Sequence, residues 1–413
     1  MIFIPIFLLF LVDLYIFKSL KPIFLNINPN LKIAIYLLFW GLSVLSYCAM
    51  FFVSYFDYRN WPGELRRWVM GISFITFATK IIMLPFFLGD DFKNAIIWIG
   101  EKFKSTPSKS IGGEAISRST FLQKSALLVG GTFFTSLLWG MAKTAYNILI
   151  NKEIIQLRNL PKPFNGIKII QISDLHLGSF ASTDPVENMV KKINDLDADI
   201  VFFTGDLVND RSKEATKYIE ILKKIKSKHG VFSTLGNHDY GDYVQWSSPA
   251  EKEKNLQDLK NIHFKIGWRL LLNENVILEK EGEKIAIIGV ENWGHKLHFP
   301  KYGDIEKALK GTENAPIKLL LSHDPSHWDY EISKKYNQID LTFAGHTHGF
   351  QFGIEIPALK IKWSPSQYIY PHWAGLYKNE NQYLYVNRGM GFLGYYGRVG
   401  IRPEITVIEL QNV

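Results

Sequence analysis

An uninterrupted run of 24 residues without a charged side chain, from Ile33 to Phe56, constrains the fold of this 413-residue chain more than any other feature. As a helix, which rises about 1.5 Å per residue, such a run crosses the hydrocarbon core of a bilayer, about 30 Å thick. Two further apolar stretches are interrupted by one charge each, Asp13 and Lys80. Residues 1–150 are therefore expected to be a helical membrane region of about four spans, near residues 2–17, 33–56, 68–89 and 125–142.

Basic residues around these spans predict their orientation, because Lys and Arg are retained on the cytoplasmic side of a membrane. Nine lie after the first and third spans: Lys18, Lys21, Lys32, Lys93, Lys102, Lys104, Lys109, Arg118 and Lys124. Three lie after the second span: Arg59, Arg66 and Arg67. We expect a multi-pass protein of the cell membrane whose region beyond residue 150 is extracytoplasmic. Within the spans, Asp13 and Lys80 would be costly in lipid and could pair with each other.

The formal net charge of +8 is unevenly distributed. Residues 1–150 carry 14 Lys and Arg against 7 Asp and Glu, a balance of +7, which leaves 33 against 32, or +1, for the remainder. The second part therefore has no basic excess, and no nucleic-acid partner is expected. A single cysteine, Cys48, excludes both an intrachain disulfide and a cluster of thiolate metal ligands.

Beyond residues 151–165, a polar stretch with two prolines that is expected to be a linker, one pattern recurs. A short apolar run ends in Asp, His, Asn or Gly, as where 167–172 leads into Ser173-Asp174-Leu175-His176. Later runs end in Gly205-Asp206, Gly236-Asn237-His238-Asp239, His323 and Gly345-His346-Thr347-His348. Runs of this length fit buried strands, and helical stretches between the first of them favour an α/β sheet. Active sites of such sheets form at the carboxyl ends of the strands.

These clusters supply imidazole, carboxylate and amide ligands: Asp174, His176, Asp206, Asn237, His323, His346 and His348. That mixture suits Mn, Fe, Zn, Co or Ni better than Ca or Mg alone. Any one cluster by itself could be a turn or a core histidine. Five of them in order, each at the end of a strand, favour a common site. Two ions held about 3.5–4 Å apart can clamp a phosphoryl group for in-line attack, so phosphate esters are the expected substrates.

The ordered motifs over residues 167–410 resemble the calcineurin-like metallophosphoesterase family, and in particular its membrane-anchored subgroup. The resemblance implies a four-layer α/β/β/α sandwich over residues 166–413 with two divalent or trivalent metal ions. It implies that the first ion is held by Asp174, His176 and His348, that Asp206 bridges the two, and that the second is held by Asn237, His323 and His346. One departure is Phe350, which stands where relatives of this subgroup often have a second glycine before Gln351.

The same resemblance implies that His238 stabilises or protonates the leaving oxygen, with Asp239 holding its ring, while a metal-bridging hydroxide attacks. A histidine suits that role because its ordinary pKa is near 6.5 and a neighbouring carboxylate favours the protonated ring. Arg388 or Arg398 could contact the phosphate, although a surface-loop arginine is an equal interpretation.

The expected function is hydrolysis of a phosphodiester or phosphomonoester by a membrane-anchored enzyme. A lipid or nucleotide-linked lipid substrate would explain four spans, because one would suffice as a tether. An enzyme like the UDP-2,3-diacylglucosamine pyrophosphohydrolase of lipid A biosynthesis is an alternative, but its nucleotide substrate is cytoplasmic and the expected orientation is not. A membrane sensor or scaffold with a structural metal site is a non-enzymatic alternative, against which every expected ligand and His238 are present.

Overall fold

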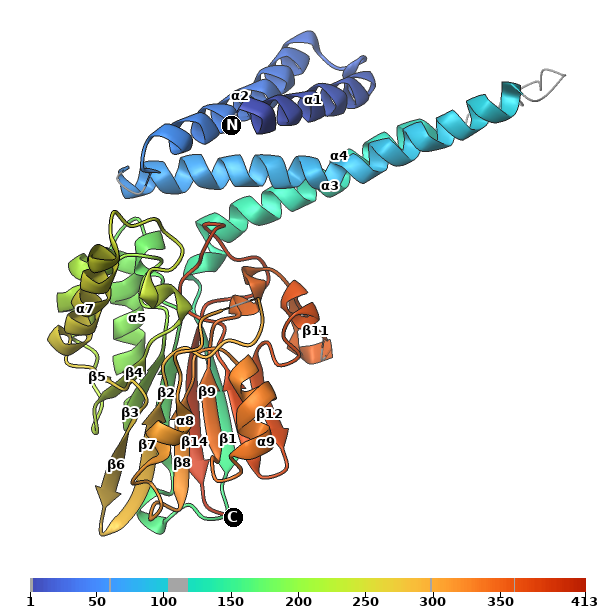
Figure 1. Cartoon of the computed structure of the whole chain (residues 1–413). Helices are drawn as coiled ribbons and strands as arrows, with labels where there is room; N and C mark the ends of the chain where they lie inside the picture. The colour runs from blue at the N-terminus through green and yellow to red at the C-terminus, as the bar shows by residue number, and fades with distance from the viewer. Residues whose placement is uncertain (1–2, 59–60, 103–117, 298, 360) are drawn as a thin grey trace. The chain divides into compact units, whose positions relative to one another are not determined.

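The computed structural model describes residues 3–58, 61–102, 118–297, 299–359 and 361–413. The chain divides into two compact units, residues 1–141 and residues 142–413 (Figure 1). We call them the membrane unit and the sheet unit, and the boundary lies earlier than the expected position near residue 150.

The membrane unit consists of long helices at all four expected positions: α1 (Phe3–Leu20), α2 (Pro29–Tyr55), α3 (Gly63–Lys102) and α4 (Arg118–Ala142). Among the described residues, three stretches are long and apolar enough to cross a membrane: Pro29–Tyr55, Gly63–Gly100 and Ser119–Tyr146. Helix α3 continues through Pro85 and is much longer than expected. Lys104 and Lys109, on which the expected orientation partly depends, lie outside the described residues.

The two charges inside the expected spans form an ion pair, as the sequence suggested. The Nζ atom of Lys80 in α3 lies 2.7 Å from Oδ1 of Asp13 in α1, and both side chains are buried. The ammonium group also donates a hydrogen bond to Oγ of Ser43 in α2, at 2.7 Å, and the hydroxyl of Tyr47 in α2 donates to Asp13. The opposite charges and the hydrogen bonds thus satisfy each other between the helices.

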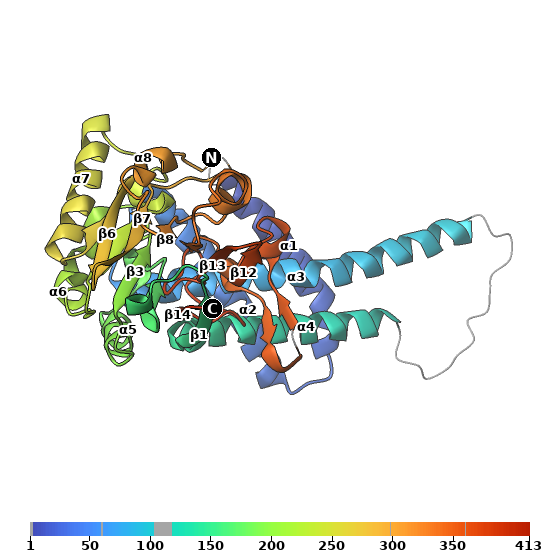
Figure 2. The same cartoon turned by 90° about the horizontal axis from the view of Figure 1, so that it is seen from below.

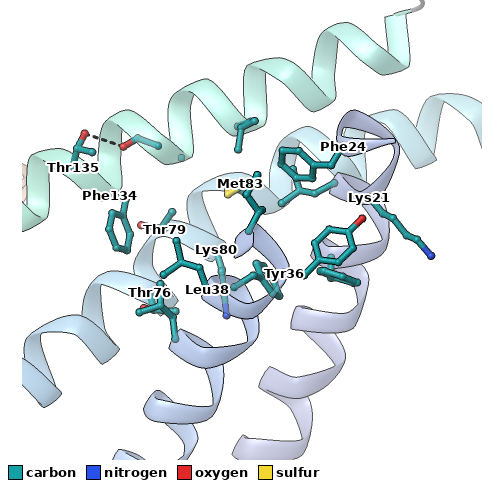
Figure 3. A pocket seen from close by; sticks show the side chains of 18 residues that line it. Lys21, Phe24, Tyr36, Leu38, Thr76, Thr79, Lys80, Met83, Phe134 and Thr135 are labelled. Atoms are coloured by element: carbon teal, nitrogen blue, oxygen red, sulfur yellow. Dashed lines mark hydrogen bonds between the residues drawn. The ribbon is translucent and has the colours of Figure 1, made fainter. Parts of the chain in front are cut away.

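Beside this ion pair, the four-helix membrane unit leaves an apolar cavity of about 290 Å³ (Figure 3). Thr76, Thr79 and Lys80 of α3 line it from one side and Phe134 of α4 from another. A Cβ atom added to Gly131 of α4 would meet no other atom within 4 Å. The glycine thus leaves room beside the cavity.

Two six-stranded sheets form the sheet unit. The first has the order β1 (Leu149–Gln156), β14 (Glu404–Gln411), β2 (Ile167–Ile172), β3 (Ile200–Thr204), β4 (Val231–Thr234) and β5 (Arg269–Leu270). The second has the order β12 (Gly375–Asn379), β13 (Gln382–Val386), β9 (Leu341–Ala344), β8 (Ile317–Leu321), β7 (Glu283–Gly289) and β6 (Glu274–Lys280). A separate antiparallel hairpin joins β10 (Ile354–Ile356) and β11 (Ile361–Trp363).

The expected four-layer sandwich is confirmed by how the strands divide their side chains. Ile169 and Phe202 face a core between the two sheets, together with Leu319 of the second sheet. The neighbouring Ile170 and Phe203 face a separate core under the helices, because successive side chains of a strand point to opposite faces. The helices of this unit are α5 (Asp184–Asn194), α6 (Ile219–Leu222), α7 (Pro249–Lys265), α8 (Ile305–Leu309) and α9 (Ser333–Lys335). Figure 2 shows α5, α6 and α7 on the outer side of the first sheet.

The interpretation of residues 151–165 as a linker is wrong for its first part. Residues 149–156 form β1, which pairs in parallel with β14 along its whole length. The strand escapes notice in the sequence because it lies at the edge of the sheet and is mostly half exposed, so that Lys152 and Glu153 interrupt its apolar residues. In the sequence, residues 143–148 thus separate the end of α4 from the start of β1.

Candidate metal centre

Parallel pairing brings the predicted ligands together. Strands β2, β3 and β4 run parallel in the first sheet, and β7, β8, β9 and β13 run parallel in the second. The carboxyl ends of parallel strands meet at one edge, and each ligand-bearing loop leaves its strand there. Asp174 and His176 follow β2, Asp206 follows β3, Asn237 follows β4, His323 follows β8, and His346 and His348 follow β9.

The structure sorts these side chains into two adjoining groups, each of which could hold a metal ion. Asp174, His176 and His348 form the first, with their candidate ligand atoms within 4.8 Å of one another. Nε2 of His348 lies 3.0 Å from Nε2 of His176 and 3.3 Å from Oδ1 of Asp174. All three residues are buried, and their polar atoms converge.

The second group consists of Asp206, His323 and His346, and Asn237 joins it. Nδ1 of His346 lies 2.8 Å from Oδ1 of Asn237 and 3.3 Å from Nε2 of His323. Oδ2 of Asp206 lies 3.2 Å from that Nε2 atom of His323 and 3.6 Å from Nε2 of His176 in the first group. The side chain of Asp206 therefore lies next to a histidine of each group.

These side chains are better suited to coordinating a cation than to hydrogen bonding with one another. Two imidazole nitrogens 3.0 Å apart can form only one hydrogen bond between them, and Nδ1 of His176 has no hydrogen-bond partner among the described residues. Burial lowers the pKa of His176 to about 3 and that of His346 to about 4, so both rings are neutral and can offer a lone pair. Buried donors of this kind are the mixture that divalent transition metals prefer.

Charges also converge on the centre. Burial raises the pKa of Asp174 to about 6. Burial opposes protonation of His323, but the adjacent Asp206 carboxylate outweighs it and raises the pKa of His323 to about 10. A bound cation would have to displace that proton and would then take over its role in neutralising Asp206. Nδ1 of His323 faces the carbonyl oxygen of Thr204 at 2.7 Å, which orients Nε2 toward the centre.

Several ligand residues have a strained backbone. The φ angles of Asp174, His176, Asp206, His346 and His348 lie between 45° and 70°. Non-glycine residues rarely adopt this left-handed conformation, and it costs of order 1–3 kcal/mol at each position. The loops also pack closely, since a Cβ atom at Gly345 would lie 2.0 Å from Oγ of Ser173. The loop conformations thus orient the ligand side chains at the expense of backbone energy.

His238 lies beside the first group without belonging to it. Its ring packs edge-on against His176, with centroids 5.0 Å apart, and lies tilted against the Tyr243 ring at 4.6 Å. Nδ1 is 2.7 Å from the carbonyl oxygen of Asn209, which fixes Nδ1 as the donor. Nε2 is then the atom that can exchange a proton with a substrate.

The expected role of Asp239 in holding the His238 ring is wrong. Its carboxylate accepts backbone N–H bonds from Gly236 and Asp206 at 2.9 Å, from Leu207 at 2.8 Å and from Val208 at 3.3 Å. Asp239 therefore clamps the loops after β3 and β4 together, and the Asn209 carbonyl does the orienting. Adjacency in sequence suggested the wrong partner, because a short helical turn directs neighbouring side chains apart.

Neither arginine considered for phosphate binding is free to do so. Arg388 is buried and forms ion pairs with Glu404 and Glu355. Arg398 is fully buried, donates to the carbonyl oxygens of Gly391 and Arg388, and lies 3.2 Å from Nδ1 of His348. It is a positively charged support of the first group.

Sequence reasoning missed the residues behind His346. Nε2 of His346 lies 2.8 Å from the Tyr370 hydroxyl and 3.6 Å from Oδ2 of the buried Asp324. This leaves Nδ1 as the atom that faces Asn237 and His323. Asp324 directly follows a ligand and could have been suspected, whereas nothing in the sequence marks Tyr370.

Comparisons with known proteins agree with this geometry. Residues 167–350 match the family model "Calcineurin-like phosphoesterase", and residues 1–145 match "Probable Calcineurin-like phosphoesterase, transmembrane domain". The chain belongs to the calcineurin-like phosphoesterase family. It is a membrane-anchored, metal-dependent phosphoesterase.

Two relatives extend the likeness over both units of the phosphoesterase. A "Transmembrane protein with metallophosphoesterase domain" of Danio rerio is 28% identical over 382 residues, which cover 90% of this chain and 80% of the relative. An "Uncharacterized metallophosphoesterase" of Helicobacter pylori is 29% identical over 406 residues, 97% of this chain and 96% of the relative. Both alignments therefore include residues of the membrane unit and of the sheet unit of this chain.

Proposed function

We propose that the phosphoesterase binds two metal ions side by side and hydrolyses a phosphodiester or phosphomonoester between them. The observation that carries this proposal is the position of Asp206, whose carboxylate lies within 3.6 Å of a histidine of each group. In this assignment Asp174, His176 and His348 hold one ion, and Asn237, His323 and His346 hold the other.

Two ions bound there would polarise the phosphoryl group and lower the pKa of water. The residues of the chain would orient the ligands and supply the acid. Burial keeps the rings of His176 and His346 neutral, and the left-handed loop conformations fix the directions of the ligand side chains. His238 receives its orientation from the Asn209 carbonyl and, when protonated, donates from Nε2 to the leaving oxygen.

We further propose that the chain crosses the membrane several times, that the sheet unit is extracytoplasmic, and that the substrate is a phosphate ester carried by a membrane lipid. The uneven distribution of Lys and Arg supports the orientation. The size of the membrane unit supports the substrate class, since one helix would suffice as an anchor.

The test uses the full-length protein in lipid nanodiscs and bis-p-nitrophenyl phosphate as substrate. A chelator should abolish turnover, and addition of Mn, Fe, Zn, Co or Ni one at a time should restore it. Undiminished turnover in the chelated protein, verified to be free of metal, would contradict the proposal and favour a scaffold with a structural site.

His238→Ala separates the acid from the ligands. We expect the metal content to be unchanged and kcat to fall about 100-fold, which is the scale of general acid catalysis. His229→Ala is the matched control, because His229 precedes β4 at the opposite edge of the sheet. Loss of metal in His238→Ala would mean that His238 is a ligand.

A further inference from the structure

The hairpin formed by β10 and β11 has an apolar face and a charged face, and their orientation is the reverse of the usual one. Ile354 pairs with Trp363, and Ile356 pairs with Ile361, so that these four share one face. The other face carries the charged pair Glu355 and Lys362. In a water-soluble hairpin packed on a domain, the apolar face is the one that turns inward.

Here the charged face is the one that turns toward the protein. Glu355 accepts a hydrogen bond from Arg388 at 2.6 Å, and Lys362 donates to the carbonyl oxygen of Ala374 and lies 4.8 Å from the centroid of the Trp373 ring. The apolar face is left exposed. Together with its neighbours it forms what we call the apolar lobe: Phe350, Ile354, Ile356, Leu359, Ile361 and Tyr368, each 40–76% exposed.

Both ends of this segment lie next to candidate metal ligands, one through the sequence and one through a side-chain contact. Phe350 comes two residues after the candidate ligand His348. Two residues beyond Tyr368, the hydroxyl of Tyr370 lies 2.8 Å from Nε2 of His346. The lobe is therefore an extension of the loop that carries two of the candidate ligands.

The lobe is also linked to the point where the chain leaves the membrane. The third candidate span ends at Tyr146, and the next residue, Asn147, accepts hydrogen bonds from Arg402 at 2.8 and 2.9 Å. The same segment, residues 388–403, holds the hairpin through Arg388 and through Val399, whose carbonyl oxygen accepts from Gly353 at 2.9 Å. Figure 1 shows the hairpin above β12, at the upper end of the sheet unit.

We propose that the apolar lobe inserts into the interfacial layer of the bilayer that the chain itself spans and so holds the metal centre at the lipid surface. Exposed Ile, Leu, Phe and Tyr side chains are the composition of such contacts, and a patch of this kind on a soluble surface would favour aggregation. The occupant of the lobe is lipid, because the segment that holds the hairpin is hydrogen-bonded to Asn147, the residue directly after the third candidate span.

A depth measurement tests the insertion without reference to catalysis. Leu359→Cys and Phe264→Cys are made in a Cys48→Ser background, which leaves one cysteine for an environment-sensitive fluorophore. Phe264 is 84% exposed, but it lies at the end of α7 that leads into β5, away from the metal-centre edge. In phosphatidylcholine–phosphatidylglycerol vesicles, doxyl-labelled phosphatidylcholine should quench the probe at 359 and not at 264. Equal quenching, or a shielded probe at 359 that doxyl lipid does not quench, overturns the proposal; the latter indicates a protein partner or a second copy.

A kinetic comparison, which rests on the proposed function, tests the consequence. Ile356→Glu combined with Leu359→Glu should lower hydrolysis of a phosphatidyl p-nitrophenyl diester in vesicles at least about tenfold and leave bis-p-nitrophenyl phosphate in water within twofold. Phe264→Glu should change neither. An equal loss on both substrates, or a loss on neither, would overturn the role of the lobe. If the parent protein hydrolyses neither diester, the proposed function fails, while the quenching result still decides insertion.

Discussion

The two units each bury a cluster of charged and polar side chains, and the clusters differ in what satisfies them. In the membrane unit, Lys80 and Asp13 form an ion pair that Ser43 and Tyr47 complete with hydrogen bonds. In the sheet unit, the buried side chains are nearly all lone-pair donors, and some of them face one another across 3.0–3.3 Å. The first cluster is completed by the ammonium group of Lys80, whereas the second brings together imidazole and carboxylate groups whose lone pairs a bound metal ion could take.

This difference separates a structural cluster from a binding site. Buried charges persist where partners satisfy them, so a cluster that the chain completes by itself explains its own presence. A cluster of converging lone-pair donors does not, because donors that face one another are satisfied together only when a ligand lies between them. Variants that interrupt one cluster or the other should therefore behave differently.

The largest effect is expected from Asp206→Asn. The variant removes the carboxylate that contacts both groups while it keeps the shape of the side chain, and kcat for bis-p-nitrophenyl phosphate should fall at least about 1000-fold. Metal analysis should show fewer bound ions, and circular dichroism should be unchanged. A normal kcat would mean that the cluster completes itself as the membrane-unit cluster does.

Lys80→Met should act on stability and not on chemistry. It leaves Asp13 buried without its cation, which costs about 3 kcal/mol in comparable buried pairs. The melting temperature in nanodiscs should fall, and the double variant Lys80→Met with Asp13→Asn should recover most of the loss. Turnover of the water-soluble diester by the folded single variant should stay within twofold. Lost turnover at an unchanged melting temperature would assign the ion pair a functional role.

Tyr370→Phe should have the smallest effect. It removes the hydroxyl at 2.8 Å from Nε2 of His346 and leaves Asp324 as the remaining support of that ring. Loss of such an outer contact typically lowers metal affinity or activity 10- to 100-fold, and we expect the lower end because Asp324 remains. A titration of the metal-free protein with Mn measures the affinity. Tyr368→Phe is the control, since Tyr368 is 76% exposed.

The seven candidate ligands could be found from the sequence because their positions follow from topology. Buried parallel strands read as short apolar runs, and the residues after them must meet at one sheet edge, as Asp174 and His346 do across 172 residues of chain, where the Asp174 carboxylate accepts the His346 N–H at 3.0 Å. The pairing of Asp13 with Lys80 was likewise foreseeable, since each would be costly alone in lipid.

The features that could not be predicted from the sequence depend on tertiary contacts, which leave no local sequence pattern. Strand β1 is half exposed at a sheet edge, so its alternation is obscured by Lys152 and Glu153. Tyr370 reaches His346 from a loop of irregular structure. In the sequence, the hairpin has the alternating pattern of an ordinary strand pair. Only the contact of Glu355 with Arg388 in the structure shows which face is turned inward.

The central claim, that the two groups around Asp206 each take an ion, is tested most directly by counting metal. Elemental mass spectrometry of the active full-length protein in nanodiscs, with protein quantified by amino-acid analysis, gives the number of ions per chain. The proposal predicts two ions in the parent protein and at most one in Asp206→Asn. Full activity with a single ion per chain, or with none, would contradict it.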